Sequence, residues 1–525
     1  MEGVPLIALV LGSLAVTWAC RRLKISSPLV LVVFGIAVSF IPGVPDFRIN
    51  PDLVLLLVLA PLLYSAALDS SYLGFRANIR PISLLAVGLV IFSTAAVGVV
   101  AWWVIPGLPL VSGLVLGAVV APPDAVAAIA VGRRLGLPRR LMTVLAGESL
   151  VNDATSLTLF RVAVAVAAGT GVSLWQGLGM FVLAGVGGVL VGWAVGWLAH
   201  RIRMRLNDPP IESAFGLVVP FAVYLLAEEA HSSGLLAVVV AGLYLGHKAP
   251  DTGFATRLQD EAVWHASDTV LESVVFSLIG LQLTSVLAEV GAVGPLLVAG
   301  LAVTAAAVLA RLVWMFPATY LPRLLPPVRA RDPIQTWRYP AVLSWAGMRG
   351  VVSLAAAFAI APGVPHREQL VFLAFFVTVG TLLLHGLTLP ALIQRLGVRG
   401  EESAADALAE AQAQHAAGRA AVERLDELAA EATNNHSATM EHVTRKLRYN
   451  AEMRTNASWE RLGRGPDEAG ESPGAAHRRL RRAMVEAERD TFVKFRDDGR
   501  IDDEVLRRVM RELDLEEAML SRDDS

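Results

Sequence analysis

The sequence predicts an all-α polytopic membrane protein that continues into a soluble helical tail. Of its 525 residues, 54% are hydrophobic and only 18% are charged, whereas soluble chains carry roughly 25% charged residues. Long apolar runs extend to about residue 400, and no later segment is apolar enough to cross a bilayer. We therefore expect a transmembrane domain over residues 1–400 and a cytoplasmic, helical regulatory tail over residues 401–525.

About thirteen apolar runs predict the transmembrane helices, since a helix needs roughly 20 apolar residues (range about 17–25) to cross the bilayer. Two short runs are separated by the polar segment AEEAHSSG, which favours two spans over one long helix. The runs cover about residues 4–20, 28–44, 52–68, 81–104, 109–131, 141–168, 174–200, 213–228, 233–247, 264–288, 292–320, 339–361 and 368–394.

The loops between these runs predict how the chain is oriented. If the N-terminus lies outside, nearly all loop arginines and lysines fall in inside loops, and the outside loops contain only Arg48 and Arg367. Such a bias marks cytoplasmic loops. No basic segment precedes the first run, which argues for a retained span and against a cleaved signal peptide. We expect a multi-pass protein of the cell membrane with its C-terminus in the cytoplasm.

Charged residues near the middle of several runs need an explanation, namely Asp124, Glu148, Asp153, Glu272 and Arg349. On insertion scales, each charge at the centre of a transmembrane helix costs about 2.5–3.5 kcal/mol. We therefore expect these side chains to face the interior of the helix bundle or a wet cavity. Structural ion pairs between helices are one explanation, and an ion-transport site is the other.

The segment GESLVND, residues 147–153, puts four polar side chains on one predicted transmembrane helix. Ser149 and Asp153 are four residues apart and share one face, while Glu148 and Asn152 share the adjacent face. One helix thus presents two neighbouring polar stripes to the interior, which favours a transport site.

Two predicted spans contain residues that interrupt a helix. Pro122 and Pro123 lack backbone donors and should break the fifth span just before Asp124. The carbonyl groups freed there need partners, and a bound cation is one way to supply them. Gly347 and Gly350 bracket Arg349 and predict a second interruption, in the twelfth span.

The positions of these interruptions predict an internal symmetry. Two six-span repeats joined by a seventh span would place both interruptions fifth in their repeat. Inverted repeats with paired broken helices are typical of secondary transporters, which bind their substrate near the bilayer midplane.

Other function classes lack the residues they need. GESLV is not the serine-nucleophile pattern G-x-S-x-G because Val151 occupies the last position, no H-E-x-x-H metal motif occurs, and Cys20 is the only cysteine. The net charge of −2 indicates no nucleic-acid partner. We expect neither an enzyme nor a resident cofactor.

Three motifs, in order, resemble those of the monovalent cation:proton antiporter-1 family, which includes bacterial NhaP-type sodium/proton antiporters. They are APPDAVAA in the fifth span, GESLVND in the sixth and WAGMRGVVSLAAAFAI in the twelfth, and the likeness covers about residues 1–400. The resemblance implies thirteen spans, crossed broken helices, a homodimer, and exchange of sodium, lithium or potassium for protons.

The resemblance also implies roles for individual residues. Asp153 matches the carboxylate that takes the cation or the proton, and Ser149 and Asp124 match oxygen ligands, so that sodium is expected at Asp124, Ser149 and Asp153. Asn152 matches the asparagine that precedes the essential carboxylate. Glu148 and Arg349 match an ion pair between the sixth and twelfth spans.

The chain departs from the family pattern at two places. A threonine common at the fifth-span break is Pro123 here, which removes a hydroxyl but leaves a backbone carbonyl for the cation. A third-span glutamate of many bacterial members is Ser65 here, which removes a charge. Glu272 matches a glutamate of the animal exchangers, and either a structural or an accessory transport role fits it.

A buried carboxylate that binds a cation or a proton, but not both, explains exchange in physical terms. A bare charge is costly to carry through the apolar barrier, so only the neutralised site crosses between the two faces. We expect one cation per proton, hence electroneutral exchange serving pH and salt homeostasis. The alternatives are a potassium/proton or calcium/proton exchanger on the same scaffold, or a cation channel or membrane sensor.

Overall fold

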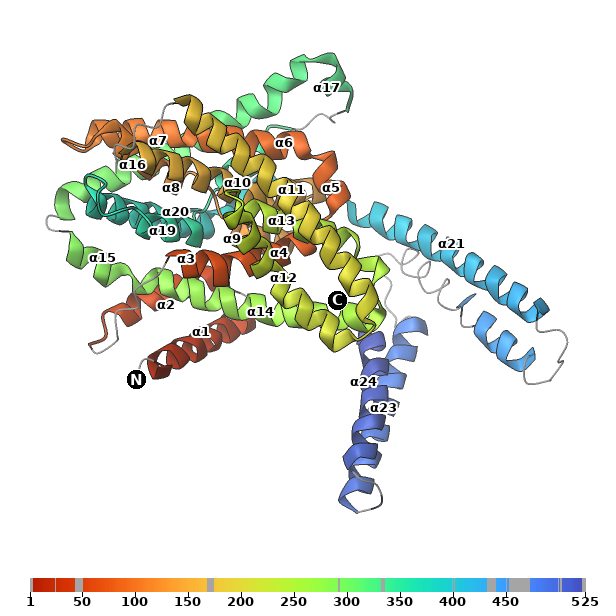
Figure 1. Cartoon of the computed structure of the whole chain (residues 1–525). Coiled ribbons are helices and arrows are strands. Elements are labelled where there is room, and N and C mark those ends of the chain that lie inside the picture. The colour runs from red at the N-terminus through yellow and green to blue at the C-terminus, as the bar shows by residue number, and fades with distance from the viewer. Residues whose placement is uncertain are drawn as a thin grey trace. The chain divides into compact units, whose positions relative to one another are not determined.

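The computed structural model describes residues 3–23, 25–42, 51–167, 174–290, 293–331, 336–398, 400, 402–431, 441–449, 451–452, 473–498, 500 and 503–521. Within these ranges all regular structure is helical, which confirms the all-α prediction (Figure 1). The chain forms two compact units, Met1–Gly400 and Glu401–Ser525. Arg48, one of the two arginines expected in outside loops, lies outside the described residues.

The first half of unit Met1–Gly400 contains α1 (Gly3–Leu23), α2 (Ser27–Ser39), α3 (Pro51–Val54), η1 (Leu55–Leu59), α4 (Ala60–Leu68), α5 (Tyr72–Ala77), α6 (Ile79–Ser83), η2 (Leu84–Leu89), α7 (Val90–Val104), α8 (Leu110–Val120), α9 (Val126–Leu135), α10 (Arg139–Ala167) and α11 (Leu174–Leu206). The second half contains α12 (Pro209–Glu229), α13 (Gly234–His247), η3 (Ala249–Asp251), α14 (Phe254–Leu281), α15 (Leu283–Glu289), α16 (Val293–Tyr320), η4 (Leu321–Leu324), α17 (Pro326–Arg331), α18 (Arg338–Trp345), α19 (Val351–Phe358) and α20 (Arg367–Leu396).

The length and composition of these helices fit a multi-pass membrane protein. Among the described residues, nine helical stretches are long and apolar enough to cross a membrane, and α2, α8 and α13 are shorter apolar helices. The number of spans and the inverted repeats stay predictions.

Helices distant in the sequence pack around the two interrupted segments. Helix α8 packs against α7 and α10, and α20 packs against α8, α16 and α19. In a second group α11, α12 and α13 pack together, α13 contacts α4, and α14 contacts α1, α2 and α12 (Figure 1).

Both predicted interruptions are confirmed. Helix α8 ends at Val120 and α9 begins at Val126, so the break contains Pro122 and Pro123, which cannot donate backbone hydrogen bonds. Helix α18 ends at Trp345 and α19 begins at Val351, so the second break contains Gly347 and Gly350.

Unit Glu401–Ser525 contains α21 (Glu402–Glu431), α23 (Pro473–Asp497) and α24 (Asp503–Ser521), and residues 441–449 are also helical. Helices α23 and α24 pack against each other, with Arg481 paired to Glu516 at 2.6 Å. The hydrogen bonds from Arg481 lower the pKa of the Glu516 carboxyl. Among the described side chains of this hairpin, Val485 and Leu513 are buried and apolar.

Candidate functional site

The two interrupted segments meet at their breaks. The backbone N–H of Asp124, in the break between α8 and α9, donates to the carbonyl oxygen of Met348, in the break between α18 and α19, at 2.6 Å. A Cβ atom on Gly350 would collide with the Asp124 carboxylate, and one on Gly347 would collide with the Arg311 side chain. These two glycines are therefore needed for the close approach of the breaks and their neighbours.

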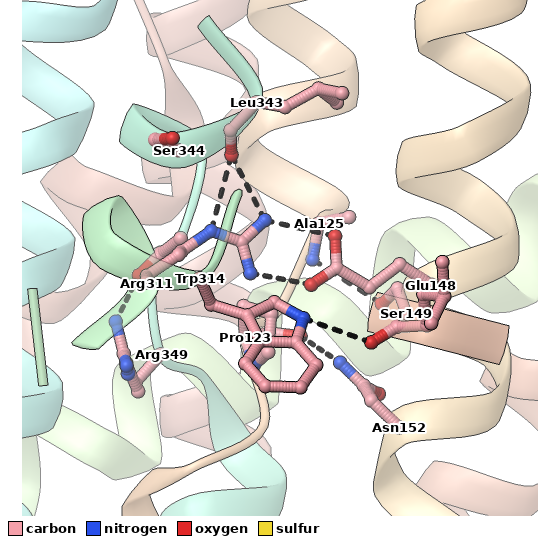
Figure 2. A network of polar contacts seen from close by, with 12 residues as sticks. Pro123, Ala125, Glu148, Ser149, Asn152, Arg311, Trp314, Leu343, Ser344 and Arg349 are labelled. Atoms are coloured by element: carbon pink, nitrogen blue, oxygen red, sulfur yellow. Dashed lines mark hydrogen bonds and ion pairs between the residues drawn. The ribbon is translucent and has the colours of Figure 1, made fainter. Parts of the chain in front are cut away.

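Helix α10 supplies polar partners to the first break. The Asn152 amide nitrogen donates to the carbonyl oxygen of Pro123 at 2.7 Å, and the backbone N–H of Ala125 donates to the Ser149 hydroxyl at 3.3 Å (Figure 2). The Ser149 side chain therefore lies beside the break. The Pro123 carbonyl already accepts a hydrogen bond from Asn152, and its second lone pair remains for a further contact.

Asp153 and Asp124 bring two carboxylates to this point. Asp153 is only 6% exposed, and its carboxylate makes no hydrogen bond or ion pair within the described part of the chain. One carboxylate oxygen of Asp124 accepts from the N–H of Val126 at 2.9 Å. The two aspartates lie within electrostatic reach of each other. A buried carboxylate without a protein partner is costly unless a proton or a cation neutralises it.

A second unsatisfied oxygen lies on the same helix. Asn152 is fully buried, and its side-chain oxygen accepts no hydrogen bond from the residues that the structure describes. Buried polar atoms are usually hydrogen-bonded. Such an atom beside Pro123 and one residue before Asp153 adds an oxygen donor to the polar stripe of α10.

The predicted ion pair between Glu148 and Arg349 is wrong. Glu148 pairs with Arg311 of α16 instead, through two contacts, Nη1 to Oε1 at 2.5 Å and Nη2 to Oε2 at 2.9 Å. Arg311 also donates to the Leu343 carbonyl from Nε at 3.1 Å and from Nη2 at 3.0 Å (Figure 2). Both charged side chains are 2% exposed. Two parallel contacts with a carboxylate match the planar fork of a guanidinium group.

Among the described residues, Arg349 does not pair with a carboxylate but bonds backbone carbonyl groups around the two breaks. Its guanidinium donates to the carbonyl oxygens of Val120 at 2.9 Å, Gly347 at 2.5 Å and Ala307 at 3.4 Å. Val120 is the last residue of α8, where carbonyl groups lack helical donors. Sequence reasoning predicted that a bound cation could satisfy such carbonyls. At Val120 the cation is the Arg349 side chain.

Arg311 was missed because sequence reasoning singled out charges in other spans. The signal was present, since Arg311 lies within the apolar segment AAAVLARLVWMF. A charged residue inside a transmembrane segment should face a partner in the bundle. The sequence does not reveal which carboxylate that partner is.

Glu272 and Ser65 lie near the same region, on α14 and α4. Glu272 is within electrostatic reach of Asp124 and of Asp268, which precedes it by one helical turn. The Ser65 hydroxyl is buried and donates to the Asp268 carboxylate at 2.6 Å. A carboxylate therefore does lie beside position 65, although α14 supplies it and not α4.

The donor set at the breaks consists of oxygen atoms, namely the side chains of Asp124, Ser149, Asn152 and Asp153 and the carbonyl of Pro123. Carboxylate, carbonyl and hydroxyl oxygens suit hard cations. In the ranges that the structure describes, no group of three or more His, Cys, Asp or Glu side chains is placed to hold a metal ion. The arrangement fits a small cation held by a few oxygens as transported cargo.

Comparison with known proteins agrees with this geometry. The family described as sodium/hydrogen exchanger, transmembrane, matches residues 7–395. An uncharacterized Na(+)/H(+) exchanger of Mycobacterium tuberculosis is 32% identical over 538 residues, covering 98% of this chain and 96% of the relative. The Na(+)/H(+) antiporter ApNhaP of Aphanothece halophytica is 31% identical over 387 residues, covering 72% of this chain and 71% of the relative.

A solved structure shares the fold. The sodium proton antiporter MjNhaP1 from Methanocaldococcus jannaschii superposes with a TM-score of 0.61 at 17% identity, covering 75% of this chain and 98% of that one. The family match spans nearly all of unit Met1–Gly400 and includes both breaks and the polar stripe of α10. The chain belongs to the sodium/hydrogen exchanger family.

Proposed function

We propose that the protein is a secondary active antiporter that exchanges monovalent cations for protons across the cell membrane. Sodium is the expected principal cation and lithium a second one. The observation that carries the proposal is the Asp153 carboxylate, buried in the membrane unit without a hydrogen bond or ion pair from the described residues, beside Asp124 and Ser149. Family membership and the named antiporters among its relatives support the same function.

Competition at Asp153 would couple the two ions. A proton or a cation neutralises the carboxylate, and the binding of one opposes the binding of the other. The ionised, empty site would have to carry an unpaired charge through the apolar barrier. If only the neutralised site passes between the two sides of the membrane, each cation that moves one way requires a proton that moves the other way.

The cation would be held by the Asp124 and Asp153 carboxylates and the Ser149 hydroxyl. Backbone carbonyl oxygen from the break, Pro123 included, would complete the oxygen shell. Asn152 would keep the break in place through its bond to Pro123. Glu272, near Asp124 on α14, would act as an accessory carboxylate.

The number of protons that move per cation depends on which carboxylates change their protonation during transport. Position 152 is an amide and cannot exchange a proton, and Glu148 is engaged by both terminal nitrogens of Arg311. If Asp124 stays ionised as a ligand, Asp153 alone changes its protonation in each cycle. Exchange would then be one proton for one cation and electroneutral.

The proposal also covers the orientation of the chain in the membrane, its oligomeric state and the role of its tail. The charge bias of the loops supports an N-terminus outside and a C-terminus in the cytoplasm. The homodimer rests on the family resemblance. The tail over residues 401–525 would lie in the cytoplasm and regulate exchange, and its polar helices support this role. The cellular purpose of the exchange would be pH and salt homeostasis.

Exchange in reconstituted vesicles tests the proposed function. Vesicles that contain a pH-sensitive dye are given sodium, lithium, potassium or calcium, and movement of protons is followed. We expect sodium and lithium to drive proton movement. Responses only to potassium or calcium would identify the alternative exchangers, and large passive cation currents without proton movement would identify a channel.

A further inference from the structure

A cavity lies between α10 and the group formed by α11, α12 and α13, and we call it the outer cavity. Its volume is about 360 Å³, and one water molecule occupies about 30 Å³ in the liquid. The outer cavity therefore has room for a monovalent cation together with several water molecules. Its lining includes Leu157, Thr158 and Arg161 of α10, Ala184 of α11 and Glu228 of α12.

The outer cavity lies near the helix ends that the charge bias predicts to face outside. Glu228 is in the last turn of α12, which ends at Glu229, and α13 begins a few residues later at Gly234. Arg161 lies within the last two turns of α10. In the predicted orientation, the loops that follow α10 and α12 are outside. The outer cavity is therefore expected in the outer half of the membrane.

Charged and polar side chains make the outer cavity suitable for water. Arg161 Nη2 pairs with Glu228 Oε2 at 2.9 Å, and these side chains are 55% and 30% exposed. Thr158, Tyr224 and His231 also contribute to the lining. Charged residues in membrane-spanning segments face the bundle interior or a water-filled cavity, and they mark ion pathways. We therefore expect water, and not a lipid chain, in the outer cavity.

One turn of α10 separates the outer cavity from Asp153. Leu157 lines the cavity and is buried, and it follows Asp153 by four residues, so both lie on the same face of α10. On another face of α10, the Ser156 hydroxyl donates to the Ala118 carbonyl oxygen of α8 at 2.7 Å. Helix α10 is thus bonded to the helix that contains the first break, while its side toward α11, α12 and α13 borders the cavity.

We propose that the outer cavity is the vestibule through which the cation reaches Asp153 from outside. Leu157 is the barrier at its inner end, since an apolar constriction excludes hydrated ions until it moves. Glu228 is the group that attracts the cation at its rim. This inference rests on the proposed exchange function, because a vestibule is needed only if Asp153 takes its cation from that side.

Two contacts hold the Glu228 carboxylate at the rim of the outer cavity. Oε2 pairs with Arg161, and Oε1 accepts a hydrogen bond from the backbone N–H of Gly234, the first residue of α13, at 3.2 Å. Arg161 therefore offsets the charge of a carboxylate that would otherwise attract cations more strongly. Without Arg161, the bond from Gly234 would still keep the carboxylate in place, so the charge of the rim can be changed by one substitution.

Cysteine labelling of the full chain in membranes tests whether water fills the outer cavity. Thr158→Cys or Ala184→Cys is combined with Cys20→Ala, which removes the native cysteine. The probe is a membrane-impermeant methanethiosulfonate reagent with a fixed positive charge, added from outside. The matched control is Val182→Cys, which is 52% exposed on α11 but does not line the cavity.

Both cavity positions should react at least about tenfold faster than position 182, because a charged reagent enters lipid poorly. Two cavity positions on different helices keep the test decisive if one variant fails to fold. Labelling rates at positions 158 and 184 equal to the rate at position 182 would overturn the proposal.

A deeper cysteine tests the barrier at Leu157. Ala154 is buried and precedes Thr158 by one turn of α10, toward Asp153. Ala154→Cys should react about tenfold more slowly than Thr158→Cys, because an apolar constriction excludes the hydrated reagent. Addition of Leu157→Ala should remove most of this difference. Equal rates at the two positions with Leu157 in place would show that Leu157 is not the barrier.

The charge of the rim is tested in the Thr158→Cys protein with cationic and anionic methanethiosulfonate reagents. Arg161→Gln should raise the ratio of the cationic to the anionic rate about fivefold, from about 1 kcal/mol between unit charges roughly 4 Å apart in water. Arg367→Gln removes the same charge at the predicted outer end of α20, away from the cavity, and should leave the ratio unchanged. Equal ratios in the two variants would overturn the role of Glu228.

Labelling and exchange together distinguish a failure of the vestibule from a failure of the proposed function, because labelling does not require transport. Sodium-driven exchange by a protein whose cavity positions do not react would overturn the vestibule and leave the proposed function intact. Labelling as expected, in a protein that exchanges none of the tested cations, would instead overturn the proposed function and with it the role of the cavity as a vestibule.

Discussion

Arg311 and Glu148 form a bidentate ion pair between α16 and α10, with both side chains 2% exposed. Arg311 packs over Gly347 and donates to the Leu343 carbonyl, so one guanidinium joins α16, α10 and the segment around the second break. Asp153 lies on the same helix as Glu148. The charge that holds these helices together is therefore separate from the carboxylate proposed to take the cation.

The first prediction concerns the stability of this pair. Arg311→Ala should lower the free energy of unfolding by about 3–5 kcal/mol, because Glu148 would remain as a buried, unpaired charge. Arg161→Ala is the control, since Arg161 is 55% exposed and pairs with Glu228 at 2.9 Å, and exposed pairs contribute about 0–1 kcal/mol. Unfolding experiments in detergent measure the free energy of unfolding of both variants and of the wild type. Similar small losses in the two variants would mean that water reaches Glu148.

The second prediction distinguishes the role of Arg349 from that of an ion-pair partner. Arg349→Lys keeps the charge but should not restore wild-type stability or exchange, because one ammonium group cannot replace the fork that bonds Val120, Gly347 and Ala307. The loss of hydrogen bonds to buried carbonyl groups should lower the free energy of unfolding by roughly 1–3 kcal/mol. Thermal unfolding and vesicle exchange check this. Full function in the lysine variant would show that charge alone is required.

The third prediction tests the contact between the two breaks. Gly350→Ala should abolish or strongly reduce exchange, because the added Cβ would displace the Asp124 carboxylate. Gly363→Ala makes the same change at an exposed position with open space around it and should leave exchange unchanged. Vesicle exchange at matched protein amounts compares the two. Equal rates would indicate that the breaks shift without loss of function.

The sequence allowed prediction of the breaks and of the polar stripe on α10, because these depend on local chemistry. Pro122 and Pro123 cannot continue a hydrogen-bonded helix wherever they lie, and Ser149 and Asp153 share a face because of helical spacing. The ion-pair partner of Glu148 could not be predicted from local chemistry in this way. It depends on how α16 packs against α10, and both Arg311 and Arg349 were chemically suitable. The bond from Ser65 to Asp268 likewise joins two helices whose proximity only the fold reveals.

The fourth prediction concerns membrane voltage. With Glu148 engaged by Arg311 and an amide at position 152, one proton should move per cation, and exchange should not depend on voltage. Vesicles clamped with potassium and valinomycin at different potentials, with a sodium-driven pH signal, measure this. A strong voltage dependence would mean that a second proton moves, and Asp124 and Glu272 would be the residues to substitute next.

The measurement that tests the central claim most directly is sodium-driven proton movement in vesicles that contain Asp153→Asn. The amide cannot exchange a proton for a cation, so we expect a folded protein with no exchange above that of empty vesicles. Asp251→Asn makes the same change on an exposed carboxylate and should exchange like the wild type. Exchange at the wild-type rate by Asp153→Asn would contradict the account, because the carboxylate that should couple the two ions would not be needed.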